Sequence, residues 1–324
     1  MTTPTDKITP HLWFDKEAWE AAELYCSIFP NSKVTNITTL HDTPSGDCDV
    51  VSFRLADQPF MAISAGPLFK FNPAISFILN FDSARDNNAR KNLDATWAKL
   101  SDRGTVRMPL DKYPFSERYG WIQDKYGVSW QLILSNPGGE QRPFIVPSLM
   151  FVGSVCGKAE EAIEFYQSVF RNSHRGLVAR YPKGMEPDKE GTVMFADFTI
   201  ENQWFAAMDS AREHDFNFNE AISFIIRCAT QEEIDSYWKK LSADPKAEQC
   251  GWCKDKFGIS WQVQPAMLNE IMNHGTSEQI DRVTQAFLPM KKFDIATLKR
   301  AYEGNKYVHL DVPKEVSVTQ TRRE

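Results

Sequence analysis

Two features of the sequence have the residue types and spacing of chemically active groups. Cys250-Gly-Trp-Cys253 has the spacing of a redox-active or zinc-binding cysteine pair. His11 is the lone histidine of an apolar segment, Ile8 to Phe14, where it could serve as an acid, a base or a metal ligand, or as a hydrogen-bonded wall residue. No nucleophile and base stand together in a pattern typical of covalent catalysis. The elements that position these side chains therefore decide what they can do.

The sequence is an internal duplication. Three segments occur twice, in the same order: ITPHLWF and IVPSLMF from Ile8 and Ile145, FNPAISFI and FNEAISFI from Phe71 and Phe218, and GWIQDKYGVSWQ and GWCKDKFGISWQ from Gly120 and Gly251. The repeat is far longer than the roughly 20 to 50 residues of a solenoid unit. The chain is therefore expected to be a duplicated domain.

The duplication weakens the case for a cysteine site. The segment that corresponds to Cys250-Gly-Trp-Cys253 reads Tyr119-Gly-Trp-Ile122, and no second cysteine pair is present. Two ordinary thiols are therefore the favoured interpretation. The six cysteines are too few and too scattered for a disulfide framework, which predicts reduced thiols. Because the first ten residues lack the apolar centre of a secretory signal, a cytoplasmic protein is expected.

Composition excludes two classes of partner. The 324 residues include 37 Lys and Arg against 43 Asp and Glu, a net charge of −6, and the isoelectric point is near 5.6. A nucleic-acid-binding protein would need a basic face, so no nucleic acid is expected. No apolar run approaches the roughly 18 residues that span a bilayer, so no membrane partner is expected.

Each half of the sequence shows the same order of elements. In the first half, the strand-like segment Ile8 to Phe14 precedes an amphipathic helix, and three further strand-like runs follow. The pattern restarts at Ala74 to Phe81. Each half therefore holds two β-α-β-β-β modules, and the fold class is α+β.

The domain boundaries follow from the repeat and from the turn-forming residues between its copies. The two domains are expected at 6–135 and 145–265, joined by a linker at 136–144 that contains Asn-Pro-Gly-Gly. Apolar residues at helical spacing predict a helical C-terminal extension at 266–324. Its end, after Pro313, is expected to fray.

Alternation along the strands predicts a ligand-binding hollow in each half. In Ala74 to Phe81, one face carries Ile75, Phe77 and Leu79 and the other carries Ser76 and Asn80. An apolar face opposite a mixed one indicates a curved sheet with helices outside and a partly polar hollow inside. The candidate ligand-binding residues are Ser76, Asn80, Trp121 and Gln131 in the first half and Ser223, Arg227, Trp252 and Gln262 in the second. The two tryptophans could instead be core residues that enter a hairpin.

The repeated segments resemble a known family. The opening pairs PHLWF with ELYCSIFPNS and PSLMF with EFYQSVFRNS, the GPLFKFNPAISF segment and the two GW-x-x-DK-x-G-x-SWQ signatures are similar to the PhnB-like group. This group belongs to the glyoxalase/bleomycin-resistance, or vicinal oxygen chelate, superfamily, and some members carry the label 3-demethylubiquinone 3-methyltransferase. The segment Asp281 to Tyr302 also resembles a C-terminal helical extension of the group. The resemblance implies paired β-α-β-β-β modules that enclose a cavity.

The resemblance also implies where a divalent metal would be bound. Metalloenzymes of the superfamily place His and Glu ligands on the inward faces of the first, fourth, fifth and eighth strands. The matching positions are His11, Ala62, Ser76 and Gln131 in the first half and Ser148, Ala207, Ser223 and Gln262 in the second. Alanine offers no donor, and Ser or a neutral amide is a poor one. No metal and no cofactor are therefore expected.

Two functions remain open at this point. The first is a binding protein for a small organic ligand, without the usual divalent metal. The alternative is an enzyme of the superfamily, either with metal-independent isomerase- or lyase-type chemistry and His11 as catalytic acid or base, or the methyltransferase of the family label. The sequence does not support the methyltransferase, because it has no Gly-rich turn typical of an S-adenosylmethionine site. A purely structural scaffold ranks third.

The duplication also bears on assembly. The chain is expected as a homodimer or as a monomer with an internal pseudo-dimer.

Overall fold

The computed structural model describes residues 7–135 and 141–304, so most of the expected linker and the C-terminal end lie outside the described residues. One sheet, sheet A, contains β1 (Ile8–Phe14), β2 (Lys33–Thr43), β3 (Gly46–Leu55), β4 (Gln58–Ser64), β13 (Ile222–Cys228), β14 (Trp252–Lys254) and β15 (Ser260–Pro265). The other, sheet B, contains β5 (Ile75–Asp82), β6 (Thr105–Tyr113), β7 (Ser116–Gln123), β8 (Ser129–Ser135), β9 (Ile145–Phe151), β10 (His174–Arg180), β11 (Val193–Ile200) and β12 (Gln203–Asp209).

One helix follows the first strand of each module, and further helices end the chain. The module helices are α1 (Ala18–Ile28), α2 (Ala89–Leu100), α3 (Ala159–Val169) and α4 (Gln231–Leu241). The C-terminal helices are α5 (Ala266–His274), α6 (Ser277–Phe287) and α7 (Ile295–Glu303). The predicted α+β fold of paired modules with a helical extension is therefore confirmed, and only the fourth module departs from β-α-β-β-β, because it has two described strands, β14 and β15, after α4. Among the described helices, none is long and apolar enough to cross a membrane.

Each sheet combines strands from both halves of the duplication. Sheet A has the order β14-β15-β13-β1-β4-β3-β2, and sheet B has the order β10-β11-β12-β9-β5-β8-β7-β6. In sheet A, β1 runs antiparallel to β13, with His11 opposite Ser223. In sheet B, β5 runs antiparallel to β9, with Ser76 opposite Ser148. Each concave face therefore contains strands from both predicted domains, 6–135 and 145–265.

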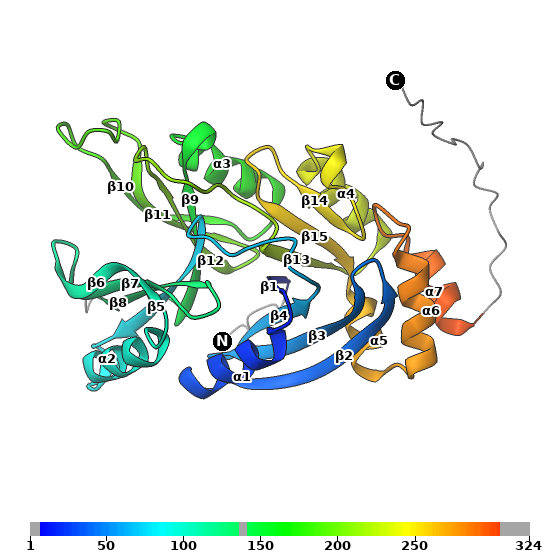
Figure 1. The fold of residues 1–324 in the computed structure, drawn as a ribbon. Coiled ribbons are helices and arrows are strands. Elements are labelled where there is room, and N and C mark those ends of the chain that lie inside the picture. Colours follow the sequence, from blue (N-terminus) through cyan, green and yellow to red (C-terminus); the bar gives the residue numbers. More distant parts are fainter. Residues whose placement is uncertain (1–6, 136–140, 305–324) are drawn as a thin grey trace, which may run out of the picture.

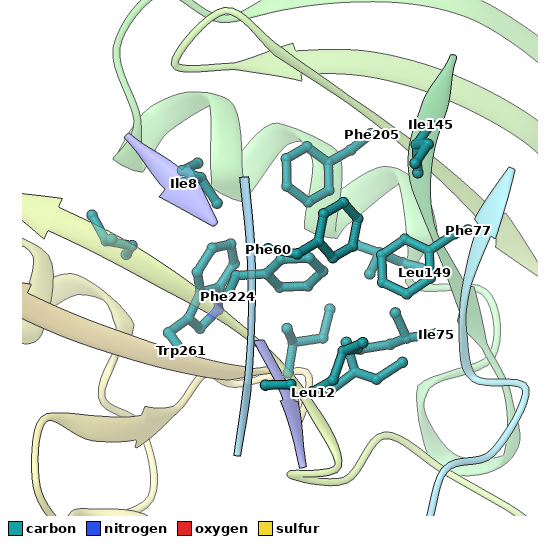
Figure 2. Close-up of a cluster of buried hydrophobic side chains, with 14 of the residues drawn as sticks. Ile8, Leu12, Phe60, Ile75, Phe77, Ile145, Leu149, Phe205, Phe224 and Trp261 are labelled. Carbon is teal, nitrogen blue, oxygen red and sulfur yellow. The ribbon is translucent and has the colours of Figure 1, made fainter. Parts of the chain in front are cut away.

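The two sheets pack against each other through their apolar faces. Figure 2 shows this central core, with side chains from strands of both sheets. Phe60 of sheet A lies 5.4 Å from Phe77 of sheet B, and Phe205 of sheet B lies 5.2 Å from Phe224 of sheet A, measured between ring centroids. The same aromatic contact thus occurs twice, as the duplication requires, and helps to bury the convex faces of both sheets.

A buried aspartate links helix α1 of sheet A to sheet B. Asp124 accepts hydrogen bonds from the Tyr25 hydroxyl at 2.7 Å and from the Trp130 indole at 2.8 Å. Since Tyr25 lies on α1, which packs on β3 and β4, this carboxylate ties sheet A to sheet B. The same carboxylate accepts from two backbone amides of its own turn, where Gly127 has a φ of 90°. The Asp-Lys-aromatic-Gly segment, Asp124 to Gly127, is therefore a tight turn closed by its own aspartate.

The second copy of this link has the same geometry. Asp255 accepts from the Tyr166 hydroxyl and from the Trp261 indole, both at 2.8 Å. Burial raises the pKa of Asp255, and the donated hydrogen bonds oppose that rise by stabilising the carboxylate. Both links are interior, so each donor removed leaves part of a buried carboxylate without a partner.

The C-terminal helices cover one edge of the concave face of sheet A. In Figure 1, α5 and α6 lie beside β2, α5 also contacts β15, and α7 packs on α6. The Thr38 hydroxyl donates to the Met272 carbonyl at 2.8 Å, and the Gln285 amide donates to the His41 carbonyl at 3.3 Å. Within residues 7–135 and 141–304, sheet B has no comparable helical cover. The extension therefore makes the two concave faces different.

The aspartate link yields a stability prediction. Tyr166→Phe removes one donor to Asp255 and should lower the free energy of unfolding by about 1 to 3 kcal/mol, the cost of a buried polar group left unpaired. Urea unfolding followed by fluorescence measures the change. Tyr113→Phe is the matched control, because its hydroxyl bonds the Pro109 carbonyl at the surface. Equal stability of the two variants would contradict the role given to the link.

Candidate functional site

The concave face of sheet A holds a pocket of about 480 Å³. Its floor consists of side chains from β1, β3, β4, β13 and β15, and its wall includes α5 and the end of α6. Most lining side chains are apolar, among them Met61, Ile63, Leu268 and Met272. This size and this mixture of apolar walls with few polar groups are typical of small-molecule sites.

His11 lies in the floor of the pocket, on the central strand β1. Its side chain is only 5% exposed, and its ring meets the Trp252 ring edge-on, with centroids 5.5 Å apart. Its Nδ1 atom is buried without a hydrogen-bond partner. Burial lowers the pKa of His11 to about 3, because no nearby carboxylate compensates the loss of water. The imidazole is therefore neutral at physiological pH.

A chain of amide hydrogen bonds crosses the floor beside His11. The Gln264 amide donates to the Gln262 side-chain oxygen at 2.7 Å, and the Gln262 amide donates to the Ser223 hydroxyl at 3.0 Å. Ser223 lies opposite His11 in the β1–β13 register. These bonds fix the orientation of Gln262 and occupy both ends of its amide.

Aromatic rings and a few charges complete the wall. Trp13 contacts Phe69 at 5.1 Å and Trp252 at 6.1 Å between ring centroids, and its indole donates to the Gly66 carbonyl. Glu220 lines the pocket and is paired with Lys254 at 2.6 Å. An apolar or aromatic molecule could stack on these rings, with polar contact at one end.

The structure brings together five of the nine predicted site residues. His11, Arg227, Trp252 and Gln262 line the pocket, and Ser223 lies beneath it, bonded to Gln262. These residues come from both halves of the sequence, because β1 pairs with β13. Their roles in binding or catalysis stay predictions.

The other four predicted residues lie together on sheet B, away from this pocket. The Tyr119 hydroxyl donates to Gln131, and Gln131 donates to Ser76, both at 2.8 Å. The Trp121 indole donates to the Ser129 hydroxyl, and the Asn80 amide donates to the Pro143 carbonyl. Their hydrogen-bonding groups are thus engaged within the protein.

The concave face of sheet B is packed at its centre. Ile78, Val146 and Ala206 form a small buried cluster against Phe195 and Trp204. The Arg142 guanidinium lies 3.7 Å from the Trp204 ring centroid. This guanidinium also pairs with Asp197 at 2.8 Å. Side chains of its own therefore fill much of this face.

Two expectations about the inward positions are wrong in detail. The two predicted sets exchange their last two members. His11 shares its concave face with Ser223 and Gln262 rather than with Ser76 and Gln131, which lie on sheet B with Ser148. The fourth-strand position is also shifted by one residue. Met61 stands beside His11 and lines the pocket, whereas Ala62 belongs to the core between the sheets. The same shift replaces Ala207 by Ala206 on sheet B.

The donor set around His11 does not suit a divalent ion. Its neighbours on the concave face are a thioether, a hydroxyl and a neutral amide, from Met61, Ser223 and Gln262. In the part of the chain that the structure describes, no three His, Cys, Asp or Glu side chains group to hold a metal. A divalent ion needs three or four good donors.

Several pocket residues were not predicted from the sequence. Trp13 shares a face with His11 because the two are separated by one residue of β1, so alternation alone could have identified it. Met61 required the correct strand register. Met272 and Phe293 come from the C-terminal extension, and only the tertiary structure places them at the pocket.

Paired β-α-β-β-β modules that curve around a pocket are the architecture of the glyoxalase/bleomycin-resistance class, as the resemblance of the repeated segments implied. The family described as 3-demethylubiquinone-9 3-methyltransferase matches residues 6–133 and again residues 143–264. The chain belongs to this family, and its tandem duplication is confirmed. A search of curated proteins found no match.

Solved structures of similar proteins cover one or both halves of the chain. A PhnB protein from Bacillus cereus, described as a 3-demethylubiquinone-9 3-methyltransferase, is 34% identical over 39% of this chain and 98% of its own, with a TM-score of 0.35. A protein from Staphylococcus aureus is 31% identical over 42% of this chain and 100% of its own, with a TM-score of 0.16. Glyoxalase I from Zea mays is 11% identical over 83% and 98%, with a TM-score of 0.49.

The buried imidazole predicts a pH dependence of stability. The pKa of His11 falls from 6.5 to about 3 on folding. At pH values between these two, His11 is therefore protonated in the unfolded chain and neutral in the native chain. The free energy of unfolding therefore decreases as the pH is lowered through this window. His11→Gln lacks this contribution. In urea titrations, the free energy of unfolding of the wild type should therefore decrease more than that of His11→Gln as the pH is lowered.

An exposed histidine serves as the control for this measurement. The hydrogen bond to Asp47 raises the pKa of His41, which gives the opposite sign. His41→Gln should therefore retain the loss of stability toward acid that His11 causes. An NMR titration in which the His11 ring protonates near pH 6.5, its ordinary pKa, would contradict the buried, neutral imidazole.

Proposed function

We propose that this protein binds a small organic molecule, largely apolar or aromatic, in the pocket of sheet A and without a divalent metal. The observation that carries the proposal is the pocket itself, about 480 Å³ with aromatic walls and a few oriented polar groups. The donor set around His11 supports metal-free binding. The occupant would contact Trp13 and Trp252 with its rings and the His11–Gln262 floor with a polar group.

The alternative function is an enzyme that uses His11 as acid or base. A general acid or base acts best with a pKa near the working pH. Burial holds the pKa of His11 at about 3, which makes its imidazole a weak base and leaves no proton to give as an imidazolium. These properties favour binding over proton transfer by His11.

The methyltransferase of the family description is not favoured for this chain. The sequence has no Gly-rich turn of the kind that holds S-adenosylmethionine. The described sheets mix parallel and antiparallel pairs, whereas the typical site follows the first strand of a parallel sheet.

We place binding in the cytoplasm, where the six thiols would remain free, and propose that the internal pseudo-dimer stands in for the pairing of two separate chains.

The duplication offers a matched pair of variants to test the binding site. Trp252→Ala removes an aromatic wall of the pocket and should weaken binding of the dye 8-anilinonaphthalene-1-sulfonate by about tenfold, since one or two kcal/mol corresponds to about 5- to 30-fold. Trp121→Ala is the same substitution at the counterpart on sheet B, and should leave the affinity unchanged. Dye fluorescence measures both. Loss of affinity in Trp121→Ala alone, or no saturable binding to the wild type, would contradict this site.

The metal-free proposal has its own test. Elemental analysis of the purified protein should find far less than one divalent ion per chain, and treatment with EDTA should leave the melting temperature and the dye affinity unchanged. A retained ion in stoichiometric amount, lost together with dye binding upon EDTA treatment, would overturn the metal-free proposal.

A further inference from the structure

We propose that His11 is the residue that determines specificity in this pocket. Through its Nε2–H group it donates one hydrogen bond, so that the preferred ligand combines an apolar body with an acceptor oxygen, such as that of a ketone, ester or amide. The inference rests on the proposed function and adds the chemical class of the ligand.

The two ring nitrogens of His11 have different surroundings. Nδ1 is buried and has no hydrogen-bond partner. Among the residues that the structure describes, the His11 side chain makes no hydrogen bond at Nε2 either, and it lines the pocket. Unlike Nδ1, Nε2 is not fully buried, so it is the nitrogen that a molecule in the pocket can reach.

The position of the proton follows from these surroundings. A neutral imidazole carries one N–H and one bare nitrogen. Nδ1 has no partner in either tautomer, and of the two arrangements a buried N–H without an acceptor is the rarer in proteins, so the bare nitrogen is assigned to Nδ1. A proton on Nε2 instead meets the pocket, where water or a ligand can accept it. The low pKa caused by burial keeps the ring neutral, so that this arrangement persists across physiological pH.

Several polar groups of the pocket are already engaged within the protein. The Gln262 amide donates to Ser223, and its oxygen accepts from Gln264. The Trp13 indole donates to the Gly66 carbonyl. Glu220 is paired with Lys254. His11 therefore presents its Nε2 among groups with internal partners, and a ligand that lacks an acceptor would strip water from this N–H without replacing it.

A pair of probes of the same shape tests this inference. In 2-acetonaphthone and 2-isopropenylnaphthalene the same ring system carries C=O or C=CH2, so that only the acceptor differs. The wild type should bind the ketone roughly three- to tenfold more tightly, the contribution of one neutral hydrogen bond. Quenching of tryptophan fluorescence measures both affinities.

Three variants assign the preference to His11. His11→Phe should bind both probes with similar affinity, because the ring remains and the donor is lost. His11→Gln, which keeps a side-chain N–H, should retain part of the preference. Ser148→Ala, at the counterpart position on sheet B, should behave like the wild type.

The outcomes separate this inference from the function on which it rests. If the wild type binds neither probe, the proposed function is contradicted, and this inference with it. If the wild type binds both equally, or if the preference survives in His11→Phe, only the inference is contradicted. Long-range proton–nitrogen NMR of the His11 ring is an independent check, because a protonated Nδ1 would overturn the assigned donor.

Discussion

The pairing of strands across the duplication is the constraint on which the structure depends. β1 joins β13, and β5 joins β9, so neither half of the sequence completes a sheet of its own. The Phe60–Phe77 and Phe205–Phe224 contacts and the two aspartate links then hold the sheets together. A site on either concave face therefore needs strands from both repeats of the sequence.

The two concave faces started from the same pattern and now differ in two ways. Among the described residues, the fourth module has only β14 and β15 after its helix, and the Cys250 and Gly251 amides before β14 donate to the Met290 and Lys291 carbonyls of the C-terminal extension. The extension thereby becomes a wall of the pocket on sheet A. On sheet B, Trp204 and Arg142 occupy the centre of the face instead. Duplication thus left one open and one filled version of the same architecture.

The sequence predicts much of the fold and only part of the site. Alternation and helical periodicity are local properties, and they identified the modules and the two faces of β5. The partner of β1 is not a local property, so the sequence could not show that His11 stands beside Ser223 rather than Ser76. The shift from Ala62 to Met61 arises because both faces of β4 are apolar and the pattern does not distinguish them. The wall from the C-terminal extension depends on tertiary packing alone.

A crystal structure of the protein with 2-acetonaphthone most directly tests the central claim, that the pocket of sheet A is the binding site and that it needs no metal. The account predicts one bound molecule per chain, with its rings beside Trp13 and Trp252 and its oxygen at His11. A molecule bound on sheet B beside Gln131, or a divalent ion held by protein side chains next to His11, would contradict it.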